Sequence, residues 1–228
     1  MSLMDKNMAK RELVEIGRKI AEKGLVVGPG GNTSVRLQDL VYMKASGVSF
    51  EYAEEEDYIG VDLNTGEVIE GSKRPTSEIW LHLECYKVRK DIGAVVHTHP
   101  PFSIAYAFQN ESLKPFTPDM VALIGSEVPV IEYVVPGGKD FAFAVGKVIK
   151  NHNGVLIKNH GLVTVGSNLK EAYYRTLLVE EGIKTIIFAK LLGNMVFFTR
   201  EQIEEINNLE VEKYRKKLLK GGFGDEEE

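Results

Sequence analysis

The sequence predicts an α/β protein of three layers, in which helices flank a central, largely antiparallel sheet. Two observations support this fold class. Amphipathic helical patterns and short apolar strand patterns are mixed along all 228 residues. The strand patterns come in pairs joined by short turns, which favours antiparallel pairing over a doubly wound parallel sheet. The length suits a single domain over residues 1–228, and the glycine- and acid-rich residues 221–228 are predicted to form a disordered tail.

The first half of the chain is predicted to contain two helices and two pairs of strands. Apolar residues at helical spacing indicate a helix over about residues 8–23, which Gly24 ends. Thr76 is the expected N-cap of a second helix that continues to about Arg89. Strands are expected at residues 35–36, 40–44, 58–63 and 67–70.

The second half begins with an uninterrupted apolar run at residues 93–97, which is typical of a buried strand. Further strands are expected at residues 128–135, 154–158 and 162–165. Further helices are expected at residues 102–108, 141–150, 169–192 and 201–219.

Composition restricts the classes of partner. Lysine and arginine number 28 against 33 acidic residues, and this mildly acidic balance lacks the basic character of a nucleic-acid binder. Charges interrupt the apolar stretches before they reach membrane-spanning length, and residues 1–13 lack the apolar run of a signal peptide. We therefore expect a cytoplasmic protein without nucleic-acid or membrane partners. The single cysteine, Cys85, excludes an internal disulfide and is expected to be a buried thiol.

The strongest chemical signal is His97-Thr98-His99 at the end of the apolar run. Alternate side chains of a strand face the same side, so both imidazoles can reach one metal ion. His160 occupies a turn between two strand patterns, followed by Gly161. Three neutral imidazoles with one open position are the ligand set of a catalytic zinc. The alternative for each histidine is a structural residue that hydrogen-bonds to the backbone.

A pair of hydroxyl residues and an acid, Thr76-Ser77-Glu78, stands at the expected start of a helix. Free backbone N–H groups and the helix dipole favour an anion there, and two hydroxyls suit a phosphate. Glu78 beside a metal can serve as general acid or base, or as a displaceable ligand; in an ordinary helix it would be a surface acid. Residues 30–34 and Ser46-Gly47 are further candidates for the phosphate cradle, although each alone indicates only a turn.

Taken in order, these motifs resemble those of the class II aldolase family, which contains L-fuculose-1-phosphate aldolase and L-ribulose-5-phosphate 4-epimerase. The likeness extends over about residues 8–190. The motifs that carry it are Gly31-Asn32-Thr33-Ser34-Val35-Arg36, Lys44-Ala45-Ser46-Gly47-Val48, Pro75-Thr76-Ser77-Glu78 with His82, Ala94-Val95-Val96-His97-Thr98-His99 and Asn159-His160-Gly161-Leu162.

The resemblance implies a nine-stranded type of antiparallel sheet between helices, in a homotetramer with active sites at subunit interfaces. It also implies a set of site residues. The metal, Zn²⁺, would be held by His97, His99 and His160, with Glu78 as a displaceable ligand and the catalytic acid or base. The substrate phosphate would be bound by Asn32, Ser46, Gly47, Thr76 and Ser77.

The implied reaction is cleavage of a ketose 1-phosphate, such as L-fuculose 1-phosphate, to dihydroxyacetone phosphate and an aldehyde. A Lewis acid stabilises the enediolate left when the C3–C4 bond breaks, and Glu78 protonates it. Two residues favour a ribulose-phosphate epimerase instead. Lys44 matches a lysine of the epimerase, and Asp119 resembles a catalytic acid that the epimerase contributes from a neighbouring subunit. Glu78 favours the aldolase, since the epimerase has aspartate there.

Two further alternatives remain within this resemblance. A dehydratase acting on a thiosugar phosphate would use a similar site. A non-catalytic domain, as in cytoskeletal relatives that keep the fold, would be expected to lose metal ligands, and all three histidines and Glu78 are present. His82 shares a helix face with Glu78 and is expected to support the site by a hydrogen bond. Tyr214 is the nearest match to a C-terminal tyrosine of the aldolase, at a poorly matching spacing.

Overall fold

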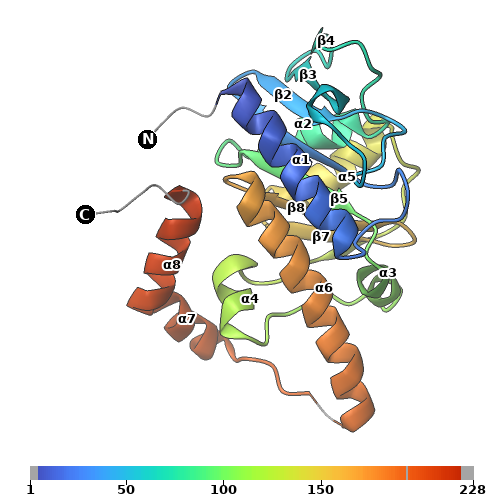
Figure 1. The fold of residues 1–228 in the computed structure, drawn as a ribbon. Coiled ribbons are helices and arrows are strands. Elements are labelled where there is room, and N and C mark those ends of the chain that lie inside the picture. Colours follow the sequence, from blue (N-terminus) through green and yellow to red (C-terminus); the bar gives the residue numbers. More distant parts are fainter. Residues whose placement is uncertain (1–4, 194, 222–228) are drawn as a thin grey trace.

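The computed structural model describes residues 5–193 and 195–221, and one sheet of eight strands lies at its centre, in the order β4-β3-β2-β1-β5-β8-β7-β6 (Figure 1). The strands are β1 (Asn32–Leu37), β2 (Leu40–Lys44), β3 (Tyr58–Asp62), β4 (Val68–Glu70), β5 (Ala94–Thr98), β6 (Val130–Ile131), β7 (Gly154–Ile157) and β8 (Gly161–Gly166). All neighbours pair antiparallel except β6 and β7, which are parallel. The predicted largely antiparallel sheet is confirmed, with eight strands in the described residues rather than the implied nine.

Helices cover both faces of this sheet, which confirms the three layers (Figure 1). They are α1 (Lys6–Glu22), α2 (Ile79–Val88), α3 (Pro101–Ala107), α4 (Pro118–Leu123), α5 (Lys139–Ile149), α6 (Leu169–Leu192), α7 (Arg200–Asn208) and α8 (Glu210–Gly221), with a short 3₁₀ turn, η1 (Glu55–Asp57). Cys85 on α2 is a free, buried thiol, as predicted. Within the described part of the chain, no helix combines the length and apolar character that crossing a membrane requires.

Side chains alternate between the two faces of each strand and so form two separate apolar cores. Val95 on β5 belongs to the core under α2 and α5, whereas its neighbour Val96 belongs to the core under α1 and α6. Because side chains alternate between the faces of a strand, His97 follows Val95 onto the α2/α5 side.

Three predicted elements differ from the structure. Thr76 does not cap α2, because residue 75 pairs in an extended bridge with Ala45 and the helix begins only after Glu78. The single helix predicted over residues 201–219 is broken at Leu209, whose ψ of 131° is extended. The strand predicted at residues 128–135 is reduced to β6, and Val128 forms a separate bridge with Leu113. Beyond Gly221, the predicted tail lies outside the described residues.

The ends of several strands lie next to one another on one side of the sheet. Asn32, at the start of β1, lies opposite His97 near the end of β5, and Thr98 lies opposite Leu162 near the start of β8. Adjacent antiparallel strands place these opposite ends side by side. The bridge between Ala45 and Pro75 adds the end of β2 and the segment that carries Glu78.

Glu180 on α6 fixes the chain just beyond β5. Its buried carboxylate accepts hydrogen bonds from Phe102 N at 3.0 Å, Ser103 N at 2.8 Å and Ser103 Oγ at 2.7 Å. These backbone groups belong to the first turn of α3, where N–H groups have no partner within the helix. The α6 helix thereby anchors the segment that follows His99.

We expect Glu180→Ala to lower the free energy of unfolding by about 2–3 kcal/mol, because it leaves buried donors without an acceptor. Urea unfolding of the two proteins measures this difference. The matched control is Glu181→Ala, an exposed neighbour on α6, for which a change within about 0.5 kcal/mol is expected. Equal effects of the two substitutions would show that Glu180 does not anchor α3.

Candidate metal centre

The three histidines singled out in the sequence converge where the adjacent ends of β1, β5 and β8 meet. His97 Nε2 lies 3.1 Å from His160 Nε2, although 63 positions separate the two residues, and 3.2 Å from His99 Nε2. His97 is fully buried, and the other two are partly buried. The structure therefore brings together the predicted ligand set.

Glu78, the residue that precedes α2, directs its carboxylate at the same cluster of imidazoles. Its Oε2 lies 3.3 Å from His97 Nε2, and its Oε1 lies 3.2 Å from His160 Nε2. Burial alone would raise the pKa of Glu78, but the charge of His97, the close approach of the His160 and His97 rings and the hydrogen bond from Asn32 hold that pKa well below its ordinary value. The same pairing raises the pKa of His97 against the opposing effect of burial, while burial, together with the charge of His97, lowers that of His99 to about 3.

The geometry of these four side chains fits a divalent metal ion. A tetrahedral metal with metal–nitrogen bonds of about 2.0–2.1 Å holds its nitrogens about 3.3 Å apart, close to the two spacings from His97 Nε2 to the other imidazoles. His97 Nδ1 donates to the Leu162 carbonyl at 3.0 Å, which leaves the Nε2 lone pair directed at the cluster. Glu78 Oε1 is buried without a hydrogen-bond partner among the described residues, as an oxygen left free for a cation or a proton would be.

Two glycines allow the histidine segments to approach one another. Gly31 has a φ of +70°, and a Cβ on it would lie 2.9 Å from the His97 carbonyl oxygen. A Cβ on Gly161 would lie 2.3 Å from the Thr98 carbonyl oxygen and 2.9 Å from the His99 ring. Gly31 belongs to the stretch predicted to cradle a phosphate, and in the structure it allows this close packing.

Phe141 is a site residue that the sequence did not single out. Its ring stacks on His160 at a centroid distance of 5.2 Å and an interplanar angle of 19°. It comes from α5, and β7 separates that helix from the turn that carries His160. No local pattern distinguishes it from an ordinary core phenylalanine, so only the fold reveals this contact.

The predicted phosphate residues fall into two groups. Ser46, Gly47 and Ser77 are exposed, and their two segments run side by side through the Ala45–Pro75 bridge. Thr76 and Asn32 are buried instead. Thr76 Oγ1 accepts a hydrogen bond from Glu78 N at 3.3 Å, and both ends of the Asn32 amide contact other side chains.

Asp119 lies away from these contacts in the described chain. It is exposed on α4, and its carboxylate pairs with Arg215 on α8 rather than with a histidine. Tyr214, the neighbour of Arg215, is also exposed. The role that the resemblance suggests for Asp119 needs a second subunit and stays a prediction.

Lys44 is buried and holds the glycine-rich segment. Its ammonium donates to the carbonyl oxygens of Pro29 and Val48 and lies 5.1 Å from the centre of the Phe50 ring. Burial lowers its pKa to about 8. These contacts explain the lysine by structure, without reference to a substrate.

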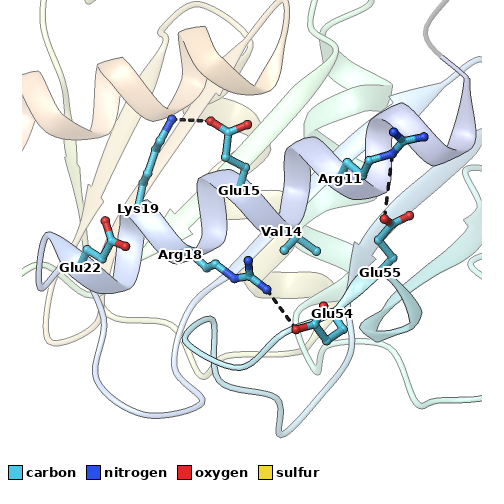
Figure 2. Close-up of a pocket in the computed structure, with 8 residues that line it drawn as sticks. All are labelled: Arg11, Val14, Glu15, Arg18, Lys19, Glu22, Glu54 and Glu55. Carbon is cyan, nitrogen blue, oxygen red and sulfur yellow. Dashed lines mark hydrogen bonds and ion pairs between the residues drawn. The ribbon is translucent and has the colours of Figure 1, made fainter.

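A hollow on the solvent side of α1 is separate from the metal centre (Figure 2). Ion pairs cross it, with Arg18 3.0 Å from Glu54 and Arg11 4.0 Å from Glu55. The residues that line it are Arg11, Val14, Glu15, Arg18, Lys19, Glu22, Glu54 and Glu55. None of these was predicted to act in catalysis, and their charges largely compensate one another.

Comparison with known proteins agrees with this geometry. Residues 11–187 match the family described as class II aldolase and adducin N-terminal domain. An L-fuculose phosphate aldolase of Methanococcus maripaludis is 35% identical over 170 residues, which cover 75% of this chain and 91% of that protein. A 3-oxo-tetronate 4-phosphate decarboxylase of Haemophilus influenzae is 32% identical over 210 residues, which cover 89% and 98%.

Among solved structures, an L-fuculose 1-phosphate aldolase superimposes with a TM-score of 0.84 at 33% identity, covering 94% of this chain and all of its own. The fold, the converging histidines and these matches agree with one another. The chain therefore belongs to the class II aldolase and adducin family, as an enzyme of the lyase class.

Proposed function

We propose that this chain is a zinc-dependent aldolase that cleaves a ketose 1-phosphate of the L-fuculose 1-phosphate type to dihydroxyacetone phosphate and an aldehyde. The observation that carries the proposal is the convergence of His97, His99 and His160 on one point that Glu78 also faces. The aldolases among the similar proteins support the substrate class.

Different side chains of the site have different roles in such a reaction. The three imidazoles and Glu78 would hold Zn²⁺, which would supply Lewis-acid stabilisation of the negative charge that develops as the carbon–carbon bond breaks. Glu78 gives a proton to the carbon left by cleavage and removes it in the reverse direction. The exposed hydroxyls of Ser46 and Ser77 and the N–H of Gly47 bind the phosphate.

The test is release of dihydroxyacetone phosphate from L-fuculose 1-phosphate, followed with a coupled dehydrogenase. We expect metal-dependent release that a chelator stops and added zinc restores. Cobalt and manganese tested in parallel identify the preferred metal, because imidazole ligands admit several.

Two other outcomes would replace the proposal. Interconversion of pentulose 5-phosphates without release of dihydroxyacetone phosphate would show that the protein is an epimerase. Lys44 and Asp119 are the residues in the sequence that favour this alternative. Release of carbon dioxide from 3-oxo-tetronate 4-phosphate would assign the reaction named for the Haemophilus relative.

We also propose a homotetramer with active sites at subunit interfaces. Large apolar side chains are exposed at the far end of α6, which extends beyond the sheet (Figure 1). Leu191 is 78% exposed and Leu192 is 90% exposed, as expected of surface that a partner covers. Light scattering coupled to gel filtration is expected to give four times the chain mass of 25.4 kDa; a monomer would contradict the proposal.

A further inference from the structure

Behind Glu78 runs an unbroken chain of buried hydrogen bonds. Asn32 Nδ2 donates to Glu78 Oε2 at 2.7 Å, and the other end of that amide, Oδ1, contacts His82 Nε2. His82 Nδ1 lies 2.7 Å from Ser34 Oγ, which lies 2.8 Å from the hydroxyl of Tyr86. Glu78 and Asn32 are 6% and 4% exposed, and the other three residues are fully buried.

The chemistry of the groups fixes the direction of the bonds between Glu78 and Ser34. An ionised carboxylate only accepts hydrogen bonds, so Asn32 must turn its NH₂ group toward Glu78 and its carbonyl oxygen toward His82. His82 must then carry its proton on Nε2 and accept a hydrogen bond from Ser34 at Nδ1. Burial lowers the pKa of His82 to about 3, so the ring is neutral at pH 7. One tautomer of His82 therefore selects one orientation of Asn32.

The two oxygens of Glu78 are consequently unlike. Oε2 is held by the Asn32 amide, whereas Oε1 has no hydrogen-bond partner in the described residues and faces His160 Nε2 at 3.2 Å. Resting on the proton-transfer role proposed above for Glu78, we propose that Asn32 and His82 are positioning residues that hold Oε2 and leave Oε1 as the oxygen that takes up and returns the proton.

This assignment gives the Asn32 side chain a role other than the phosphate binding that the resemblance implies. Both ends of its amide are already engaged, and the side chain is almost completely buried. To bind a phosphate, the amide would have only its second N–H, on a side chain that is 4% exposed, which conflicts with binding a ligand that enters from solvent. The exposed Ser46, Gly47 and Ser77 carry no such conflict.

The tautomer of His82 tests the proposal without any catalytic assay. NMR of protein labelled with ¹⁵N-histidine separates the protonated and unprotonated ring nitrogens of the 5 histidines, and the spectrum of His82→Gln identifies the His82 signals. We expect a neutral ring protonated at Nε2 throughout pH 6–8, and loss of this fixed pattern in Asn32→Leu. A ring protonated at Nδ1, or a positively charged ring, would overturn the proposal.

Kinetics then separate positioning from phosphate binding. Asn32→Leu keeps the shape and burial of the side chain but removes the donor, so we expect kcat to fall about 10–100-fold. KM, the inhibition constant of inorganic phosphate and the metal content should stay within about threefold of wild type. Ser77→Ala is the matched contrast, with an expected weakening of phosphate inhibition and rise in KM of about tenfold.

The conservative variant provides a second contrast. His82→Gln retains an N–H donor for Asn32 and should keep kcat within about fivefold of wild type, whereas His82→Leu should behave like Asn32→Leu. If Asn32→Leu raises KM and weakens phosphate inhibition at unchanged kcat, Asn32 belongs to the phosphate pocket and the proposal is wrong. If wild-type protein cleaves no ketose phosphate, the proposed function fails while the NMR result still decides the fixed tautomer.

Discussion

His97→Ala is expected to abolish metal binding and aldol cleavage together. His97 Nε2 is the central atom of the cluster, within 3.3 Å of both other imidazoles and of Glu78. Its removal leaves two imidazoles and a carboxylate, and the loss of several kcal/mol of Lewis-acid stabilisation lowers kcat/KM by about 10³-fold or more. Metal content by elemental analysis and dihydroxyacetone phosphate release by coupled assay measure the two effects.

Thr98→Val is the matched control for this substitution. Thr98 is the next residue of the same buried strand and faces the other side of the sheet. Its hydroxyl is buried without a hydrogen-bond partner in the described chain, so a methyl group can replace it without breaking a contact. We expect metal content and activity like those of wild type. Full metal occupancy in His97→Ala would mean that the ligand set is wrong.

Glu78→Gln is expected to keep the metal but to lose most proton exchange at the ketose carbon. Glutamine has nearly the same shape and can still accept the hydrogen bond from Asn32, but it cannot carry the proton. General acid–base catalysis contributes about 10²–10⁴-fold, so exchange should slow by that factor. Deuterium uptake by dihydroxyacetone phosphate, followed by NMR, measures the rate.

Glu84→Gln offers a comparable change on α2, at a half-buried carboxylate outside the cluster. Its exchange rate should match that of wild type. Near-normal exchange in Glu78→Gln would remove Glu78 from the proton transfer. Loss of metal in Glu78→Gln would make Glu78 an essential ligand rather than a displaceable one.

Much of the fold and the clustering of the three histidines could be predicted, because each rests on a local pattern. The alternation of a strand places His97 and His99 on one side, and the apolar run before them predicts the buried strand that supports them. Gly161 and the strand patterns around it predict the turn at His160. The predicted three layers follow from paired strands between amphipathic helices and are confirmed.

The roles of other residues depend on tertiary contacts that no local pattern contains. Thr76 has the identity of a helix cap, but pairing of its neighbour Pro75 with Ala45 delays the helix by two residues. Asn32 looks like a turn residue in the sequence, and only the sheet register places it opposite His97 and beside Glu78. The six-residue α4, which carries Asp119, is too short for helical periodicity to predict. The tetramer and the cytoplasmic location stay predictions.

Diffraction at the zinc absorption edge, from crystals grown with Zn²⁺, tests the account most directly. We predict one anomalous peak bonded to the Nε2 atoms of His97, His99 and His160. A zinc-loaded crystal with no peak between these atoms, or with the ion held by other residues, would contradict it.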